Sequence, residues 1–449
     1  HHALEFSPHN NTLYNGNDGG IYQTTNAGTN WNELSSGLYI AQIYKIGTSQ
    51  QSQDKVINGY QDNGTSINIG SAFTTEIGGD GMECIIDPTN DNYMYGALYY
   101  GDIRRSTNGG SNFNSIVGPI NENGGWVSPY TLDPNNANRM YAGFDNVWRN
   151  NDVRNTTNWT QISNFTGTSN MTDMQLAPSN SSVMYVSRAR NGERFFRSTN
   201  ATAANPTWTN LSGVLPVNAT PKDIEIDPND PSHLFIALNN DIYESTNSGN
   251  SWTNISGTLP NISINTIVLD KDSPVDAMYV GMDVGVYYRD NSLSDWLMYS
   301  TGLPNVEVTE LEIYRNPNEC KSTLYAATYG LGLWKGDLKD PGSIAAVACF
   351  DISQTSICSG DRVDLTDLSS FSPTSWSWTI SPATFNYVGG TNASSQNPQV
   401  VFNAAGAYSV QLSATNAIGA DVVTKANLIT VSSSTNAISF NDDFESYAN

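Results

Sequence analysis

The chain has 449 residues, and 20 Lys and Arg residues against 43 Asp and Glu residues give it a formal net charge of −23. This acidity excludes nucleic acid as a partner, because a phosphate backbone would be repelled. No apolar run is long enough to cross a bilayer as a helix. The many Gly, Asn and aromatic residues favour short strands joined by turns over disorder.

A unit of four parts recurs from Leu4 onward. Its first part alternates apolar and other residues and often ends in Asp-Pro, as in "MECIIDP". The second part is similar to "YMYGAL" and the third part to "GDIRRST". The fourth part begins with an aromatic residue, as in "WTNIS". Alternation with a period of two, bounded by turn residues, predicts four short antiparallel strands in each unit. Because one such sheet cannot bury both of its faces, the repeat predicts a β-propeller, in which several sheets stack around an axis.

The number of blades follows from counting the first strands. The units begin near Leu4, Ile43, Met82, Tyr130, Met174, Ile224, Ile267 and Leu311. The last unit shows three strands and no closing Trp strand, so both a seven-bladed and an eight-bladed ring fit the count. The chain starts directly in a strand pattern, and we expect it to belong to a longer polypeptide.

The stretch between the third and fourth strands is nearly identical in three units, which read "TTNAGTNW", "STNGGSNF" and "STNSGNSW". Short polar side chains bond the local backbone of a tight hairpin, Gly accepts a positive φ, and the final aromatic ring packs between neighbouring sheets. The pattern resembles the Asp-box, or BNR repeat, of sialidase-like and sortilin-like propellers. Asn26, Asn108 and Asn247 stand where that family usually has Asp, which argues against ion binding at the boxes.

The second unit departs from the repeat, since it lacks both the Asp-Pro corner and the Trp strand and contains "GYQDNGT" and "GGDGM". Function is more common where local consistency breaks. Together with "NDGGIYQTT", these stretches resemble large BNR-repeat proteins that Gram-negative bacteria export by type IX secretion and that are often labelled glycosyl-hydrolase-like. The resemblance covers about Leu4 to Leu338 and implies an extracellular or cell-surface location.

Three aspartates in Gly-rich turns, Asp18, Asp62 and Asp80, are the candidate catalytic residues. Glycoside hydrolysis needs two carboxylates that face each other across a cleft, one with a raised pKa. Xyloglucanase-type propellers place their acid and base on two separate propellers, whereas this chain contains one. Capping of turns at the blade ends is therefore the better explanation of these aspartates.

We expect a binding or structural protein of the adhesion type, with a glycan or another surface protein as its partner, and glycoside hydrolysis is the alternative. The candidate ligand-binding residues are Gln61, Asp62, Asn63, Asp80 and Trp126, of which Trp126 would stack on a sugar. Sialidase chemistry is disfavoured because "ERFFRST", the nearest match to the Phe/Tyr-Arg-Ile-Pro signature, is an ordinary third strand. The four His residues show no triad or metal-ligand spacing, and no organic cofactor is predicted.

Two of the four cysteines flank one short apolar stretch, "CFDISQTSIC". This spacing predicts a disulfide between Cys349 and Cys358 that staples the first strand to its return. Cys84 lies in a strand-like segment and Cys320 in a turn, and we expect a buried free thiol and an isolated surface thiol.

The repeat pattern ends after its last unit. The sequence therefore predicts a propeller (1–340), a linker (341–347), a second domain (348–433) and a tail (434–449). The second domain has regularly spaced strands that fit a β-sandwich of the immunoglobulin class. It resembles a PKD domain, whose pattern matches at Pro398, Phe402, Gly406, Tyr408, Val410 and Leu412. PKD domains act as spacers or adhesive modules in surface proteins.

The tail resembles a linker followed by the first strand of a further module. Asp442, Asp443 and Glu445 could supply hard oxygen ligands to calcium at a sandwich edge, although a solvated acidic run explains them better. The sequence thus predicts an all-β protein that consists of a seven- or eight-bladed β-propeller and an immunoglobulin-like (PKD) β-sandwich.

Overall fold

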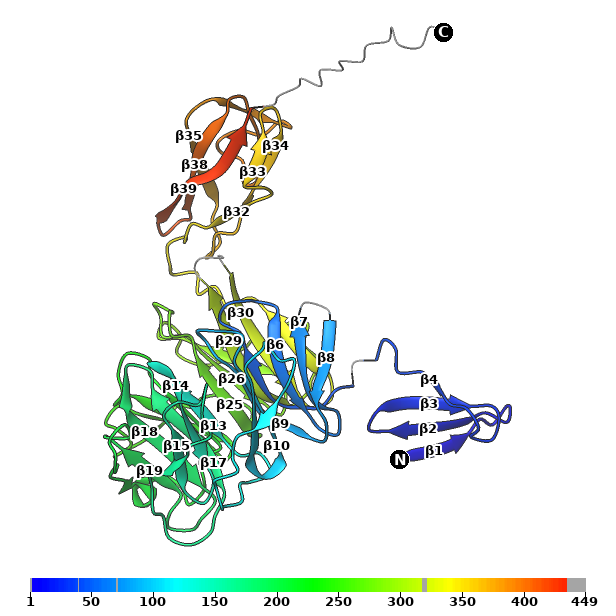
Figure 1. The fold of residues 1–449 in the computed structure, drawn as a ribbon. Helices are drawn as coiled ribbons and strands as arrows, with labels where there is room; N and C mark the ends of the chain where they lie inside the picture. Colours follow the sequence, from blue (N-terminus) through cyan, green and yellow to red (C-terminus); the bar gives the residue numbers. More distant parts are fainter. Residues whose placement is uncertain (1, 39, 70–71, 317–320, 434–449) are drawn as a thin grey trace, which may run out of the picture. The chain divides into compact units, whose positions relative to one another are not determined.

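A computed structural model describes residues 2–38, 40–69, 72–316 and 321–433. The described chain is all-β, and its helical turns are the 3-10 turns η1 (Tyr99–Gly101) and η2 (Ser212–Val214). It forms two compact units, the first of which extends to Lys339 and the second of which begins at Asp340 (Figure 1). Among the described residues, no helix has the length and apolar character needed to cross a membrane. The predicted tail, with its candidate calcium ligands, lies outside the described residues.

Seven sheets surround one cavity, which we call the channel, and each sheet lines it with its first strand. These innermost strands are β5 (Ile43–Thr48), β9 (Gly81–Ile86), β13 (Tyr130–Asp133), β17 (Met171–Ala177), β21 (Asp223–Ile226), β25 (Ile264–Leu269) and β29 (Val308–Asn316). The ring closes between β29 and β5, where the Glu310 carboxylate accepts the Ile46 N–H at 2.5 Å although the two residues are 264 positions apart. The propeller therefore has seven blades.

Each blade adds antiparallel strands outward from the channel in chain order. The second strands are β6 (Lys55–Tyr60), β10 (Met94–Leu98), β14 (Asn136–Gly143), β18 (Asn180–Arg188), β22 (Leu234–Leu238), β26 (Met278–Met282) and β30 (Lys321–Thr328). The third strands are β7 (Gly64–Ile69), β11 (Asp102–Ser106), β15 (Val147–Asn150), β19 (Phe195–Ser198), β23 (Asp241–Ser245), β27 (Val286–Arg289) and β31 (Gly332–Gly336). The fourth strands are β8 (Ala72–Ile77), β12 (Asn114–Ser115), β16 (Thr160–Gln161), β20 (Thr209–Asn210), β24 (Thr253–Asn254) and β28 (Leu297–Met298).

The first repeat unit also forms a four-stranded sheet, β1 (Ala3–Phe6), β2 (Leu13–Asn17), β3 (Gly20–Thr24) and β4 (Asn32–Glu33). No residue of this sheet lines the channel. Tyr14 of β2 is 37% exposed, whereas the tyrosines at the same repeat position, Tyr95, Tyr141, Tyr185 and Tyr279, are 0% exposed. The eight repeat units thus form a ring of seven blades and one additional sheet.

The recurring hairpin between the third and fourth strands is held by its own side chains. In the second box the Ser106 hydroxyl accepts the Gly110 N–H at 2.9 Å, and Asn108 Oδ1 accepts the Asn112 N–H at 3.1 Å. The other two boxes repeat both bonds, with Gly28 and Asn30 and with Gly249 and Ser251 as donors. An amide oxygen therefore performs the structural task that a carboxylate oxygen performs in an Asp-box.

This geometry predicts the effect of changing Asn108. Asn108→Ala removes the acceptor for the Asn112 N–H and the Ser106 hydroxyl, and we expect it to lower the free energy of unfolding by about 1 kcal/mol. Asn108→Asp keeps an oxygen at the same place and is expected to cost less than half as much. Urea unfolding followed by tryptophan fluorescence measures both, and an equal loss in the two variants would contradict this role of the side chain.

The second unit is a sandwich of two four-stranded sheets. One sheet orders its strands as β32 (Phe350–Ile352), β34 (Arg362–Asp367), β37 (Gln399–Phe402) and β36 (Phe385–Val388). The other orders β33 (Ser356–Cys358), β39 (Ala420–Ser432), β38 (Gly406–Thr415) and β35 (Ser375–Ser381). Trp378 and Tyr408 pack between the sheets, and the Tyr408 hydroxyl donates back to the Ala404 carbonyl at 2.8 Å, as the tyrosine corner of immunoglobulin-like sandwiches does.

The predicted Cys349–Cys358 disulfide is wrong. Cys358 is free and exposed, so Cys349, which is disulfide-bonded, does not pair with it. The physical reason is that the chain does not return as a hairpin after the first strand: β32 joins β34 in one sheet, and β33 pairs in parallel with β39 in the other. The expectation of a buried free thiol at Cys84 is confirmed, and Cys320 lies outside the described residues.

Candidate functional site

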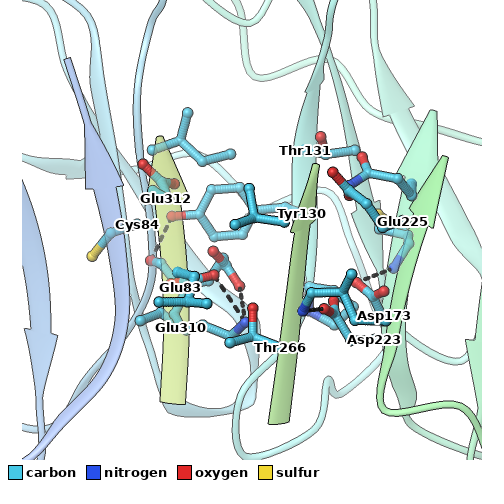
Figure 2. A pocket seen from close by; sticks show the side chains of 18 residues that line it. Glu83, Cys84, Tyr130, Thr131, Asp173, Asp223, Glu225, Thr266, Glu310 and Glu312 are labelled. Atoms are coloured by element: carbon cyan, nitrogen blue, oxygen red, sulfur yellow. Dashed lines mark hydrogen bonds and ion pairs between the residues drawn. The ribbon is translucent and has the colours of Figure 1, made fainter. Parts of the chain in front are cut away.

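The channel has a volume of about 260 Å³ and is lined by side chains at alternate positions of the innermost strands. Figure 2 shows carboxylates from β9, β17, β21 and β29 that point into it, while the sulfur of Cys84 turns away. The six carboxylates are those of Glu83, Asp173, Asp223, Glu225, Glu310 and Glu312, and Lys45 is the one basic residue in the lining. Lys45 Nζ lies 3.0 Å from Glu310 and 4.0 Å from Glu83.

These carboxylates connect neighbouring blades. The inner edges of the first strands have no strand to pair with, so their N–H groups need other acceptors. Asp173 accepts the Ile224 N–H at 2.7 Å, Glu225 accepts the Leu269 N–H at 3.3 Å, and Glu312 accepts the Thr48 N–H at 2.6 Å. In each case the donor belongs to the next blade around the ring. The acidic lining is therefore part of what holds the ring together.

Burial raises the pKa of several channel carboxyl groups. The pKa of Asp173 rises to about 8, with the Asp223 charge adding to the effect of burial, and that of Glu225 also rises to about 8. Burial and the Glu310 charge raise the pKa of Glu312 to about 8, and burial raises that of Asp223 to about 6. For Lys45, the carboxylates of Glu310 and Glu83 outweigh burial and raise its pKa. Burial in the channel therefore favours the protonated form of these carboxyl groups.

No group of three or more His, Cys, Asp or Glu residues within the described ranges is arranged to hold a metal ion. The sequence reasoning missed the channel carboxylates. A signal was present, because "TDMQL", "DIEID" and "TELEI" place acidic or amide residues at alternate positions of strands whose other residues are apolar. In an innermost strand, that alternation places the polar side chains on the channel wall.

The three predicted aspartates lie together, and we call them the acidic group. The Asp62 N–H donates to the Asp80 carboxylate, and Asn63 Nδ2 donates to the Asp18 carbonyl at 3.4 Å. Loss of water contact, with the Asp18 and Asp80 charges adding to it, raises the pKa of Asp62. A hydrogen bond from His2 lowers the pKa of Asp18. Asp62 has a left-handed backbone with a φ of 59°, which the tight β6–β7 turn requires.

Gln61 also lies in this turn, where its Oε1 accepts the Tyr44 hydroxyl at 3.2 Å. Trp126 is not in the acidic group and instead belongs to a set of exposed rings that we call the aromatic platform. Its ring stacks on that of Tyr99, with centroids 5.5 Å apart and planes 8° apart, and Tyr100 meets both rings edge-on. The three rings are 42–54% exposed. The sequence contains a signal for the two tyrosines, because "YYG" places two aromatic residues at the tip of a hairpin, where polar residues are usual.

Backbone bonds fix the platform before any ligand arrives. The Tyr100 N–H donates to the Gly125 carbonyl, and the Gly124 N–H donates to the Tyr100 carbonyl, both at 3.1 Å. A Cβ on Gly124 would lie 1.9 Å from Ser128 Oγ, so a larger residue here would displace the Ser128 hydroxyl. Backbone hydrogen bonds therefore hold together the two loops that carry the platform.

The acidic group and the platform lie at the end of the ring where the innermost strands begin, and together we call them the rim site. Asp80 directly precedes β9, and Trp126 lies in the segment that leads to β13. A Cβ placed on Gly79 would be 3.9 Å from the Tyr99 ring, so the two halves of the site adjoin. This arrangement offers an exposed aromatic surface with carboxylate acceptors beside it.

Comparison with known proteins identifies the second unit and the fold of the first. The PKD domain model matches residues 349–427. Among solved structures, an ancestral GH74 enzyme is 13% identical, with a TM-score of 0.54 over 86% of this chain and 62% of that chain. The GH74 xyloglucanase from Xanthomonas campestris is 12% identical, with a TM-score of 0.52 over 73% of this chain and 58% of that chain.

YCF48 bound to D1 peptide is 12% identical, with a TM-score of 0.50 over 67% of this chain and 94% of that chain. The chain spans 62% and 58% of the two GH74 proteins, and these likenesses show the fold alone. No curated protein matches the sequence. The chain therefore combines a seven-bladed β-propeller with an immunoglobulin-like PKD domain.

Proposed function

We propose that the propeller binds glycans at its rim site and serves as the recognition module of a modular extracellular protein. The observation that carries this proposal is the aromatic platform: Tyr99, Tyr100 and Trp126 form one exposed surface on two loops that are joined by backbone hydrogen bonds. Large aromatic rings in mutual contact are usually buried, and an exposed set with a polar border marks a binding surface.

The chemistry of the rim site suits a carbohydrate. The apolar face of a pyranose ring packs on a flat aromatic ring, while its hydroxyl groups need acceptors at the border, which Asp62, Asp80 and the Gln61 amide supply. Binding sites of this kind combine a hydrophobic surface with a few placed polar groups. In this proposal the residues predicted from the sequence supply the polar border, and the tyrosines add to the stacking surface that Trp126 was predicted to provide.

The context of the propeller fits the same proposal. A PKD domain follows it, and two solved proteins that share the propeller fold have GH74 in their descriptions, one as a xyloglucanase. We infer an adhesion-type role at the surface of a Gram-negative bacterium. In this proposal the repeats are of the BNR type, the protein is exported by type IX secretion, and the PKD domain acts as a spacer.

Affinity electrophoresis in gels that contain soluble xyloglucan, mixed-linkage β-glucan or mannan tests the proposal. We expect at least one of these polysaccharides to retard the protein, and Trp126→Ala to weaken the binding at least tenfold. The matched control is Trp31→Ala, since Trp31 has a similar exposure, 39% against 43%, but lies outside the platform. Equal retardation of Trp126→Ala and the parent protein, or no retardation in any gel, would remove the support for a rim glycan site.

Hydrolysis of the same glycans is the second candidate function. It is favoured by the raised pKa of Asp62 next to the Asp80 carboxylate, because a glycosidase needs one carboxyl group that keeps its proton beside another that is ionised. Release of reducing ends from a retained polysaccharide, abolished in Asp80→Asn, would establish this activity. Retention without release would leave binding as the function.

A further inference from the structure

Neighbouring blades are joined by a tryptophan at the start of the fourth strand. At three interfaces its indole Nε1 donates to the carbonyl of the residue that directly follows the fourth strand of the preceding blade. The pairs are Trp159 with Ile116 at 2.8 Å, Trp208 with Ile162 at 2.9 Å, and Trp296 with Ile255 at 2.8 Å. Each indole thus occupies a socket between two blades.

Trp296 belongs to a hydrophobic cluster that two neighbouring blades share. Met278 and Val280 come from the second strand of the same blade, and Ile242, Ile255 and Leu259 come from the preceding blade. Trp296 fills the socket and is 6% exposed.

The seventh blade has this socket but lacks the strand that would fill it. Its sheet contains β29, β30 and β31, and no described strand pairs with the outer edge of β31. Next to that edge lies a cavity of about 250 Å³, lined by Leu324, Ala326, Val286, Tyr299 and Leu303 among others.

Five residues that line this cavity match residues of the Trp296 socket by their position in the repeat. Leu324 and Ala326 occupy the repeat positions of Met278 and Val280, as "LYAAT" and "MYVGM" show. Val286, Tyr299 and Leu303 correspond in the same way to the three residues of the preceding blade, Ile242, Ile255 and Leu259. The Tyr299 carbonyl has the position of the acceptor for the indole, because Tyr299 directly follows β28.

We propose that the seventh blade captures an extended segment of a partner polypeptide, which adds a fourth strand to β31 and inserts a tryptophan into this socket. The segment follows the fourth-strand pattern of the repeat, Trp-Thr-Asn-Ile/Leu-Ser. Strand addition supplies main-chain hydrogen bonds, and the socket supplies specificity for the indole. The surface is distinct from the rim site, and the inference does not depend on the proposed function.

The internal symmetry of the ring argues for this occupant. The interface is repeated within the chain, so the chemistry that fills it is known from the filled copies. A second folded copy is a poor occupant, because each described segment of this pattern, including those that start at Trp31 and Trp252, is already paired within its own sheet. A segment outside the described sheets is therefore needed.

A peptide from the chain itself provides the probe. We expect fluorescein-labelled GNSWTNISG, residues 249–257, to bind the full chain saturably in a fluorescence anisotropy titration. The same peptide with Trp252→Ala should bind at least tenfold more weakly. Ala326→Phe fills the socket in the protein and should also weaken binding at least tenfold.

Thr301→Trp is a second blocking variant that keeps the test decisive if Ala326→Phe does not fold, since Thr301 lines the same cavity from an exposed position. Met298→Glu on the outer strand of the sixth blade is the control and should leave binding unchanged. Three outcomes would overturn the proposal: no binding, equal binding of the Trp252→Ala peptide, or self-association of the chain that Thr301→Trp abolishes, which would make a second copy the occupant.

Discussion

Acidification from about pH 8 to about pH 5 is expected to stabilise the propeller. Asp173, Glu225 and Glu312 have folded-state pKa values of about 8, whereas unfolded carboxyl groups titrate near 4. Between these values the folded chain binds more protons than the unfolded chain, so stability falls as the pH rises. A difference of one pKa unit between the folded and unfolded states of one group is equivalent to about 1.4 kcal/mol. We expect the free energy of unfolding to be lower at about pH 8 than at about pH 5 by more than about 3 kcal/mol.

The variant Glu225→Gln distinguishes the contribution of the channel carboxyl groups to the pH dependence of stability from the contribution of surface charges. The amide oxygen still accepts the Leu269 N–H that Glu225 accepts at 3.3 Å, but it carries no charge at any pH. We expect the variant to be more stable than the parent at about pH 8 and equally stable near pH 5, with a shallower pH dependence. Differential scanning calorimetry across this range measures the effect.

The control is Glu33→Gln, which removes the same charge from an exposed position in β4. It should leave the pH dependence unchanged. If Glu225→Gln and the parent showed parallel stability profiles, the buried channel carboxyl groups would not be the source of the pH dependence.

The fold was predictable because the sequence pattern of one blade recurs several times along the chain. Alternating apolar residues, turn residues at fixed places and a recurring aromatic residue each give a weak signal, but they coincide in unit after unit and so predict the propeller. The number of blades was not predictable. Whether Leu4 or Ile43 starts the ring depends on which innermost strand meets β29, and that is decided by the Glu310 and Glu312 bonds to β5, which connect residues far apart in sequence.

The candidate site was predictable in part because some of its residues depart from the repeat. Asp18, Asp62 and Asp80 could be selected because Gly-rich turns break the repeat, and the structure places them together. Trp126 could be selected as a single residue, but its stacking on Tyr99 depends on two loops that meet through backbone bonds. The Cys349–Cys358 disulfide failed because spacing along the chain does not show that the chain crosses from one sheet of the sandwich to the other between them.

The tryptophans distinguish the ring from the additional sheet. Trp159 and Trp31 occupy the same position of the repeat, at the start of a fourth strand. Trp159 is 8% exposed and packs between two blades, with its indole bonded to the Ile116 carbonyl. Trp31 is 39% exposed, and its sheet leaves Leu4 and Phe6 of β1 more than half exposed. One sequence position thus has two environments, according to whether a neighbouring blade covers it.

Trp159→Ala is therefore expected to lower the free energy of unfolding by about 3 to 5 kcal/mol, because it empties a buried socket and leaves the Ile116 carbonyl without its donor. Trp31→Ala is expected to change it by less than about 1 kcal/mol, as exposed substitutions do. Urea unfolding of both variants, followed by far-ultraviolet circular dichroism, measures the difference. Losses of similar size would mean that a partner blade covers Trp31 as well, and the seven-bladed ring would then not be the complete folding unit of the repeats.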